Sequence, residues 1–124
     1  MRLPRKCSMT DRADFARVKT TGHAKAGRFV ILSTLPDPSL DTIRTGFITS
    51  KRSAKRAHDR VLMRRRFRAL VQKHAPQFTD IRRFLVTIAR PGASQATFQE
   101  IEEDWVRQAR RLGLLPKPAS SPPP

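Results

Sequence analysis

The side chains best suited to chemistry in this sequence are the cations of one basic stretch in the middle of the chain. Ten Lys or Arg residues and a single acid, Asp59, lie between Lys51 and Lys73. The stretch therefore carries +9 of the chain's formal charge of +16. Most of these cations are arginines, whose planar guanidinium groups form paired hydrogen bonds to phosphate oxygens. This composition is typical of a surface that binds a phosphate polymer.

The same stretch predicts a helix from about Ala54 to about His74. At helical spacing, a basic row is formed by Arg60, Arg64 and Arg68. A neighbouring apolar row is formed by Met63, Phe67, Leu70 and His74. A plain solvated surface helix is the alternative, but like charges four residues apart repel each other, and a bound polyanion would remove that repulsion. We interpret this helix as an element that faces nucleic acid.

Length and composition limit the classes of protein that fit. The chain has 124 residues, enough for one domain with a modest core, and its pI near 11.8 favours a polyanionic partner. Its apolar runs are too short to span a bilayer, and the first residues lack the apolar region of a secretory signal. The single cysteine, Cys7, fits a reducing compartment. We expect a cytoplasmic protein with no membrane partner.

Residue patterns of a self-sufficient active site are missing from the sequence. It contains no nucleophile elbow, phosphate-binding loop or zinc-ligand spacing, and its three histidines are far apart. Acids gather only near the start of the last expected helix, where the helix dipole explains them and a metal site is the less favoured alternative: Glu100, Glu102, Glu103 and Asp104. No catalytic residue is predicted. RNA is favoured over DNA because no helix-turn-helix, heptad or zinc pattern is present.

The remaining elements must position the basic helix. We expect a first helix from Asp11 to about Thr20, capped by Thr10, and a last helix after a capping box at Thr97–Glu100. The apolar face of the last helix is expected to comprise Phe98, Ile101, Trp105, Ala109 and Leu112. Strands are expected at 28–35, at 42–50, antiparallel to the first, and at 84–89. The order helix, strand, strand, helix, strand, helix predicts an α+β fold, a small mixed sheet with flanking helices.

Domain organisation follows from the same reading. Residues 1–9 are expected to be a basic arm, 10–113 a single RNA-binding domain, and 114–124 a disordered tail rich in Pro and Ser.

Several motifs, taken in order, resemble a known family. Gly46 to Arg52 ends a strand in a small residue followed by Lys-Arg, and Lys55 to Arg60 leads into Arg64, Arg65 and a later Arg68. In this order and spacing the chain resembles the protein subunit of bacterial ribonuclease P. The likeness extends over about residues 3 to 112, through the first helix near Phe15 and the strand before Gly92.

The resemblance implies a fold, an activity and partners. In this family a ribonucleoprotein endonuclease removes the 5′ leader from precursor tRNA, and the RNA subunit performs the hydrolysis with bound Mg²⁺. The protein would contribute no catalytic residue, bind no cofactor alone and strengthen metal binding at the RNA site. Its partners would be ribonuclease P RNA and precursor tRNA, not DNA, and its sandwich fold would have a left-handed crossover around the basic helix. RNA contacts would come from Lys51, Arg52, Lys55, Arg56, Arg60, Arg64, Arg65 and Arg68.

The resemblance also implies a cleft for the leader between the first helix and the sheet. Its expected residues are Phe15, Arg17, Lys19, Arg28 and Phe29. The two aromatic rings would form a wall for bases, and the cations would follow the phosphates. Ordinary core packing is an equally weighted alternative for both rings.

The sequence departs from the family pattern at positions that matter for RNA contact. The family's Arg-Asn-Arg is Arg60-Val61-Leu62 here, and Lys19 and Leu32 stand where cleft aromatics are expected. We therefore expect Arg65, Arg66 and Arg68 to take a larger share of the RNA contact, and leader binding to depend less on stacking. Three alternatives remain open: a structural RNA-binding protein of ribosomal type, a diverged paralogue without the activity, and a DNA-binding regulator.

Overall fold

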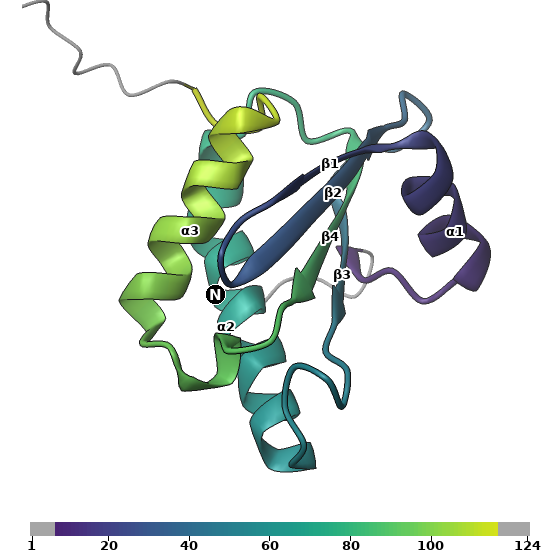
Figure 1. Ribbon diagram of the computed structural model, residues 1–124. Helices are drawn as coiled ribbons and strands as arrows, with labels where there is room; N and C mark the ends of the chain where they lie inside the picture. Colours follow the sequence, from purple (N-terminus) through teal and green to yellow (C-terminus); the bar gives the residue numbers. More distant parts are fainter. Residues whose placement is uncertain (1–6, 117–124) are drawn as a thin grey trace, which may run out of the picture.

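A computed structural model of the chain describes residues 7–116. Residues 1–6 of the expected arm and 117–124 of the expected tail lie outside that range. The helices are α1 (Arg12–Thr21), α2 (Ala57–His74) and α3 (Phe98–Arg111). The strands are β1 (His23–Ala26), β2 (Val30–Pro36), β3 (Arg44–Ile48) and β4 (Arg83–Ala89). The predicted α+β class is confirmed (Figure 1).

The four strands form one mixed sheet in the order β1-β2-β4-β3. Strand β2 pairs antiparallel with both β1 and β4, and β4 pairs parallel with β3. Strands β2 and β3 therefore run antiparallel as predicted, but β4 lies between them and they do not form a hairpin. The nearly continuous burial of β4 explains its place, because a strand covered on both faces belongs at the centre of a sheet. The handedness of the β3–α2–β4 connection stays a prediction.

Strand β1 was not predicted from the sequence. Its four residues, His23–Ala26, are all exposed and have no apolar alternation. It is an edge strand held by its pairing with β2, where His23 lies opposite Thr34. The expected strand at 28–35 consequently begins two residues later, because residues 27–29 form the β1–β2 turn.

Helices cover both faces of the sheet (Figure 1). Helix α1 packs on one face against β2 and β4, and α2 and α3 lie together on the other. The larger core cluster lies between the sheet and these two helices and includes Leu32, Phe67 and Trp105, all fully buried. A smaller cluster on the α1 face includes Val18, Phe84 and Val86. The sheet therefore separates two apolar core clusters.

Most of the expected helical details are confirmed, with shifts at the helix starts. The capping box is present: Thr97 Oγ1 accepts from the Glu100 N–H at 3.1 Å, and Glu100 Oε1 accepts from the Thr97 N–H at 2.9 Å. Helix α1 is capped by Asp11, not Thr10, because Asp11 Oδ1 accepts from the Ala13 N–H at 2.9 Å. Helix α2 begins at Ala57 instead of Ala54. The backbone N–H groups of Ser53 and Ala54 donate to the Ser50 carbonyl and form a separate turn before the helix.

The ends of the folded unit reach beyond the predicted boundaries. Cys7 and Met9, placed in the arm, are buried, and Ser8 bridges to Thr45 on β3. Leu114 and Leu115, placed in the tail, are 0% and 5% exposed and belong to the larger core cluster. The packed domain therefore includes residues on both sides of 10–113.

One carboxylate joins helices α2 and α3. Glu102 Oε2 lies 2.8 Å from Lys73 Nζ and 2.8 Å from His74 Nε2. The imidazole of His74 stacks on Trp105 with ring centroids 5.5 Å apart, which confirms its predicted place on the inner face. The hydrogen bond from Lys73 is the largest cause that lowers the pKa of Glu102, opposed by burial and assisted by His74.

We expect the contribution of Glu102 to stability to depend on pH. Because its pKa is lower in the folded protein, the ionised carboxylate stabilises the fold above the unfolded-state pKa of about 4.3, and this stabilisation is lost as the pH falls through the folded pKa. The variant Glu102→Gln should be less stable than wild type at pH 7, and the difference should shrink toward about pH 3. Urea unfolding at both pH values measures it. Glu103→Gln is the control, and a difference of equal size at both pH values would contradict the expectation.

Candidate nucleic-acid interface

A loop between β3 and α2, residues 49–56, carries four exposed cations and is called the basic loop here. The cations are Lys51, Arg52, Lys55 and Arg56. Ser53 Oγ donates to the Ser50 carbonyl at 2.7 Å and accepts from the Ser50 N–H at 3.1 Å. Arg60 Nη1 donates to the carbonyls of Ala54 and Lys55, each at 2.9 Å. The loop is therefore held by its own contacts while its cations face solvent.

Four of the five arginines of α2 contact other parts of the protein, and Arg65 makes no such contact within residues 7–116. Besides Arg60, Arg64 donates to Thr49 Oγ1 at 3.0 Å and Arg66 to the Ala96 carbonyl at 3.2 Å. The guanidinium of Arg68 lies 5.6 Å from the ring centroid of Phe47. Arg65 is exposed and takes part in no hydrogen bond or ion pair within residues 7–116. In the predicted ladder, Arg60 and Arg64 thus hold the basic loop, and Arg68 contacts β3 while staying exposed.

The apolar departures from the family pattern lie on the outer side of α2. Val61 and Leu62 are 39% and 37% exposed. They share this side of the helix with Arg65. Their side chains are not needed for the core, so the substitutions change the surface and leave the fold intact.

A groove lies between α1 and the sheet. Its volume is about 330 Å³, and its lining includes Phe15, Lys19, Ser33, Ile48, Val86 and Ile88. The ring of Phe15 packs over Gly46, where a Cβ atom would lie 2.5 Å from Phe15 Cζ. The absence of a side chain at Gly46 on β3 therefore leaves room for the Phe15 ring. The groove offers a mainly apolar floor with one lysine at its edge.

The structure places only part of the predicted leader cleft in this groove. Phe15 and Lys19 line it. Arg17 instead lies over the ring of Phe84 at 5.7 Å, with its guanidinium 3.6 Å from an Asp37 carboxylate oxygen. Arg28 and Phe29 line a separate cavity, because they belong to the β1–β2 turn at the end of the sheet. The five residues do not form one cleft.

The cleft position expected at Leu32 is also corrected. Leu32 is fully buried in the larger core cluster, on the α2 and α3 face, whereas Ser33 lines the groove. Successive residues of a strand point to opposite faces, so a shift of one residue moves the side chain across the sheet. Among the described residues, Phe15 is thus the one aromatic side chain that lines the groove.

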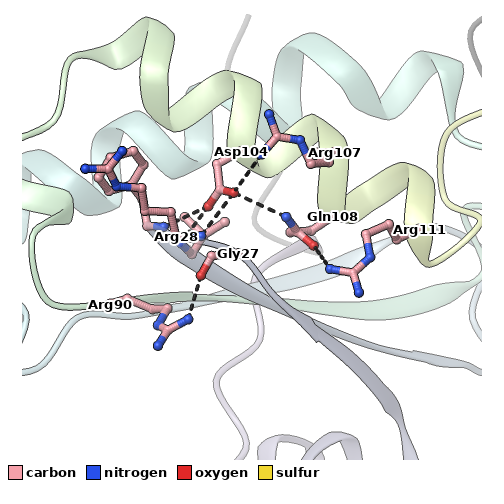
Figure 2. Close-up of polar contacts among 9 residues, drawn as sticks. Gly27, Arg28, Arg90, Asp104, Arg107, Gln108 and Arg111 are labelled. Atoms are coloured by element: carbon pink, nitrogen blue, oxygen red, sulfur yellow. Dashed lines mark hydrogen bonds and ion pairs between the residues drawn. The ribbon is translucent and has the colours of Figure 1, made fainter.

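Asp104 is a structural residue that the sequence interpretation missed (Figure 2). It is 3% exposed. Its carboxylate accepts hydrogen bonds from three successive backbone N–H groups, two in the β1–β2 turn and one at the start of β2: Arg28 at 3.2 Å, Phe29 at 2.8 Å and Val30 at 3.1 Å. Gln108 Nε2 donates to it at 3.2 Å. The helix dipole, invoked for the whole acidic group, does not account for Asp104.

A signal for Asp104 was present in the sequence. It lies three residues after Ile101 and four before Gln108, on the same side of α3 as Trp105. A carboxylate on the buried face of a helix needs partners, and backbone N–H groups supply them here. The neighbouring acids have other roles, since Glu100 completes the capping box and Glu102 joins the helices.

Neither a metal centre nor a membrane span is found within residues 7–116. No three His, Cys, Asp or Glu side chains gather there in a way that could hold a metal ion. No helix in this range has the length and apolar character needed to cross a membrane.

Comparison with known proteins identifies the family. The family model described as Ribonuclease P matches residues 3–113. The ribonuclease P protein component of Chloroflexus aggregans is 34% identical over 110 residues, covering 89% of this chain and 80% of that protein. That of Syntrophomonas wolfei is 28% identical over 118 residues, covering 95% of this chain and 97% of that protein. The Staphylococcus aureus RNase P protein superposes with a TM-score of 0.80 at 23% identity, covering 88% of this chain and 97% of that one, and so shares the fold. The basic loop, the arginine-rich helix and the match along nearly the whole chain together place this protein in the ribonuclease P protein component family.

Proposed function

We propose that this chain is the protein subunit of ribonuclease P, which binds the catalytic RNA and the 5′ leader of precursor tRNA to promote removal of the leader. The observation that carries the proposal is the group of exposed cations on the basic loop, held in place by Arg60, in a member of this family. The RNA performs the hydrolysis with Mg²⁺ at its own active site. The protein supplies binding and orientation.

The order of the basic loop favours binding to a folded RNA. A loop that is already fixed loses little conformational entropy when it binds, so more of the attraction between its cations and phosphates remains as affinity. Arg65, exposed on α2, adds a further cation. A ribosomal structural protein is the alternative from another class, and membership in this family disfavours it.

The groove between α1 and the sheet is the proposed site for the leader. An extended single strand fits a groove that has an apolar floor and a cation at its edge. Phe15 would stack on or pack against a base, and Lys19 would contact a phosphate. With one aromatic ring in the groove, the leader would be held by shape and charge more than by stacking.

Reconstitution tests the proposed function. The organism's own ribonuclease P RNA is incubated with precursor tRNA at low Mg²⁺, with and without this protein, and the rate of leader removal is measured. We expect the protein to raise that rate. Absence of stimulation across a range of Mg²⁺ concentrations, with RNA that is active alone at high Mg²⁺, would refute the proposal.

We expect Phe15→Leu to weaken the recognition of precursor tRNA selectively. Leucine keeps apolar packing over Gly46 but removes the flat ring, so the reconstituted enzyme should lose about 5- to 20-fold in affinity for leader-bearing tRNA and little for mature tRNA. Equilibrium binding to both RNAs measures the difference. Met9→Ala, a change at a buried residue of the same core cluster that does not line the groove, is the control for packing. Equal losses for the two RNAs would assign Phe15 to the core.

A further inference from the structure

Three segments that are distant in sequence meet at one end of the sheet. Val30 at the start of β2 lies opposite Ala89 at the end of β4, and Ile48 at the end of β3 lies opposite Ile88. The β1–β2 turn, the β4–α3 connection (residues 90–97) and the basic loop therefore emerge side by side. Ser94 Oγ donates to the Ser53 carbonyl at 3.4 Å, which links the last two segments.

Two cavities adjoin at this end. The first has a volume of about 440 Å³, and its lining includes Arg52, Lys55, Arg56 and Asp59. The second has a volume of about 340 Å³, and its lining includes Arg28, Phe29, Pro91 and Glu100. Gly92 and Gln95 line both cavities, so the two lie on either side of the β4–α3 connection. We call the pair the end track.

The two parts of the end track differ in chemistry. Three cations and one carboxylate surround the first cavity, which suits a phosphate group. In the second, the guanidinium of Arg28 lies over the ring of Phe29, 5.1 Å from its centroid. Unstacked nucleobases bind on aromatic rings and on guanidinium planes. The Glu100 carboxylate accepts from the Thr97 N–H at 2.9 Å and so has a partner within α3.

The Arg28–Phe29 pair stands on a rigid turn (Figure 2). Asp104 accepts hydrogen bonds from the backbone N–H groups of both residues. On the other side, Arg90 Nη1 donates to the Gly27 carbonyl at 2.6 Å. Because the turn is already held in place, the Arg28–Phe29 pair loses little conformational entropy when it binds a base.

We propose that the end track binds an unpaired nucleotide of ribonuclease P RNA, with its phosphate in the first cavity and its base against Arg28 and Phe29. The inference rests on the proposed function and adds a contact separate from the leader groove, which lies on the α1 face of the sheet. RNA is the partner that fits because the track continues directly from the cations of the basic loop. Gln95, at the boundary of the two cavities, has a side-chain amide that can hydrogen-bond to a base edge.

Binding of full-length variants to ribonuclease P RNA tests the inference. Arg28→Gln keeps the backbone hydrogen bond to Asp104, and Phe29→Leu keeps apolar packing while removing the ring. We expect each to weaken binding about fivefold or more. Arg82→Gln, an exposed cation at the opposite end of β4, is the matched control and should change binding less than about twofold. In addition, a photo-crosslinker at Gln95 should attach to an unpaired nucleotide.

The outcomes separate this inference from the proposed function. Wild-type protein that neither binds ribonuclease P RNA nor stimulates cleavage would refute the proposed function itself. Wild-type activity, together with Arg28→Gln and Phe29→Leu proteins that bind like the Arg82→Gln control, would overturn the end track alone. Crosslinks confined to paired nucleotides or to another protein would overturn it as well. If Phe29→Leu lowers the unfolding temperature, Arg28→Gln and the crosslink decide.

Discussion

Replacing four exposed cations by glutamine is expected to lower the affinity for ribonuclease P RNA by about 10²–10³-fold at about 0.15 M salt. The four are Arg52, Lys55, Arg56 and Arg65. Each cation that neutralises a phosphate releases about 0.7–0.9 of a counterion, which corresponds to a factor of about four to five in affinity at this salt concentration. The product of four such factors gives the expected loss.

The salt dependence of binding distinguishes phosphate contacts from a general loss of charge. The slope of log K against log salt should become shallower by about one per contact, hence by about three to four in the quadruple variant. A matched variant removes four exposed charges outside the proposed interface: Arg12, Arg44, Arg82 and Arg110. It should keep most of the wild-type slope. Equal slopes for the two quadruple variants would remove the basic loop and Arg65 from the interface.

Arg60→Gln should behave differently from the exposed cations. Its guanidinium donates to two carbonyls of the basic loop, so its loss should lower the free energy of unfolding by about 1–2 kcal/mol. Arg65→Gln should leave that free energy nearly unchanged. The pair therefore separates an arginine that shapes the loop from one that meets the RNA.

The sequence was most informative where a local pattern determines the structure. The apolar row of α2 and the capping box of α3 depend on residues three or four positions apart, and both were predicted. The burial of Trp105 followed from the same spacing. The basic stretch was likewise visible as a charge pattern, although its division into a loop and a helix was placed three residues too early.

Features that depend on partners far along the chain were not predictable in this way. Strand β1 has no apolar pattern of its own and exists because β2 offers it an edge. The insertion of β4 between β2 and β3 depends on burial of the whole sheet. Arg28 and Phe29 were assigned to the leader cleft as the first residues of the expected strand at 28–35, but they belong to the β1–β2 turn at the end of the sheet.

Asp104→Ala is expected to lower the free energy of unfolding by about 3–4 kcal/mol. The substitution removes the charged acceptor of three backbone N–H groups, two of them part-buried and that of Val30 buried. Donors left without an acceptor away from water each cost about 1–3 kcal/mol, less where water can enter. For a domain of this size the total is a large share of its stability. Urea unfolding at pH 7 measures the change, and Glu103→Ala on the exposed side of α3 is the control.

Gly27 provides an independent test of the same contact. A Cβ atom there would lie 2.2 Å from Asp104 Oδ1, so Gly27→Ala should push the carboxylate off the turn and cost about 2–3 kcal/mol. The φ angle of Gly27 lies outside the left-handed region, so alanine brings no backbone strain. In the Asp104→Ala background, Gly27→Ala should lower the free energy of unfolding far less, because the carboxylate that it would clash with is gone. Strictly additive effects in this double-mutant cycle would show that the two residues act independently, and the carboxylate would then not be what holds the turn.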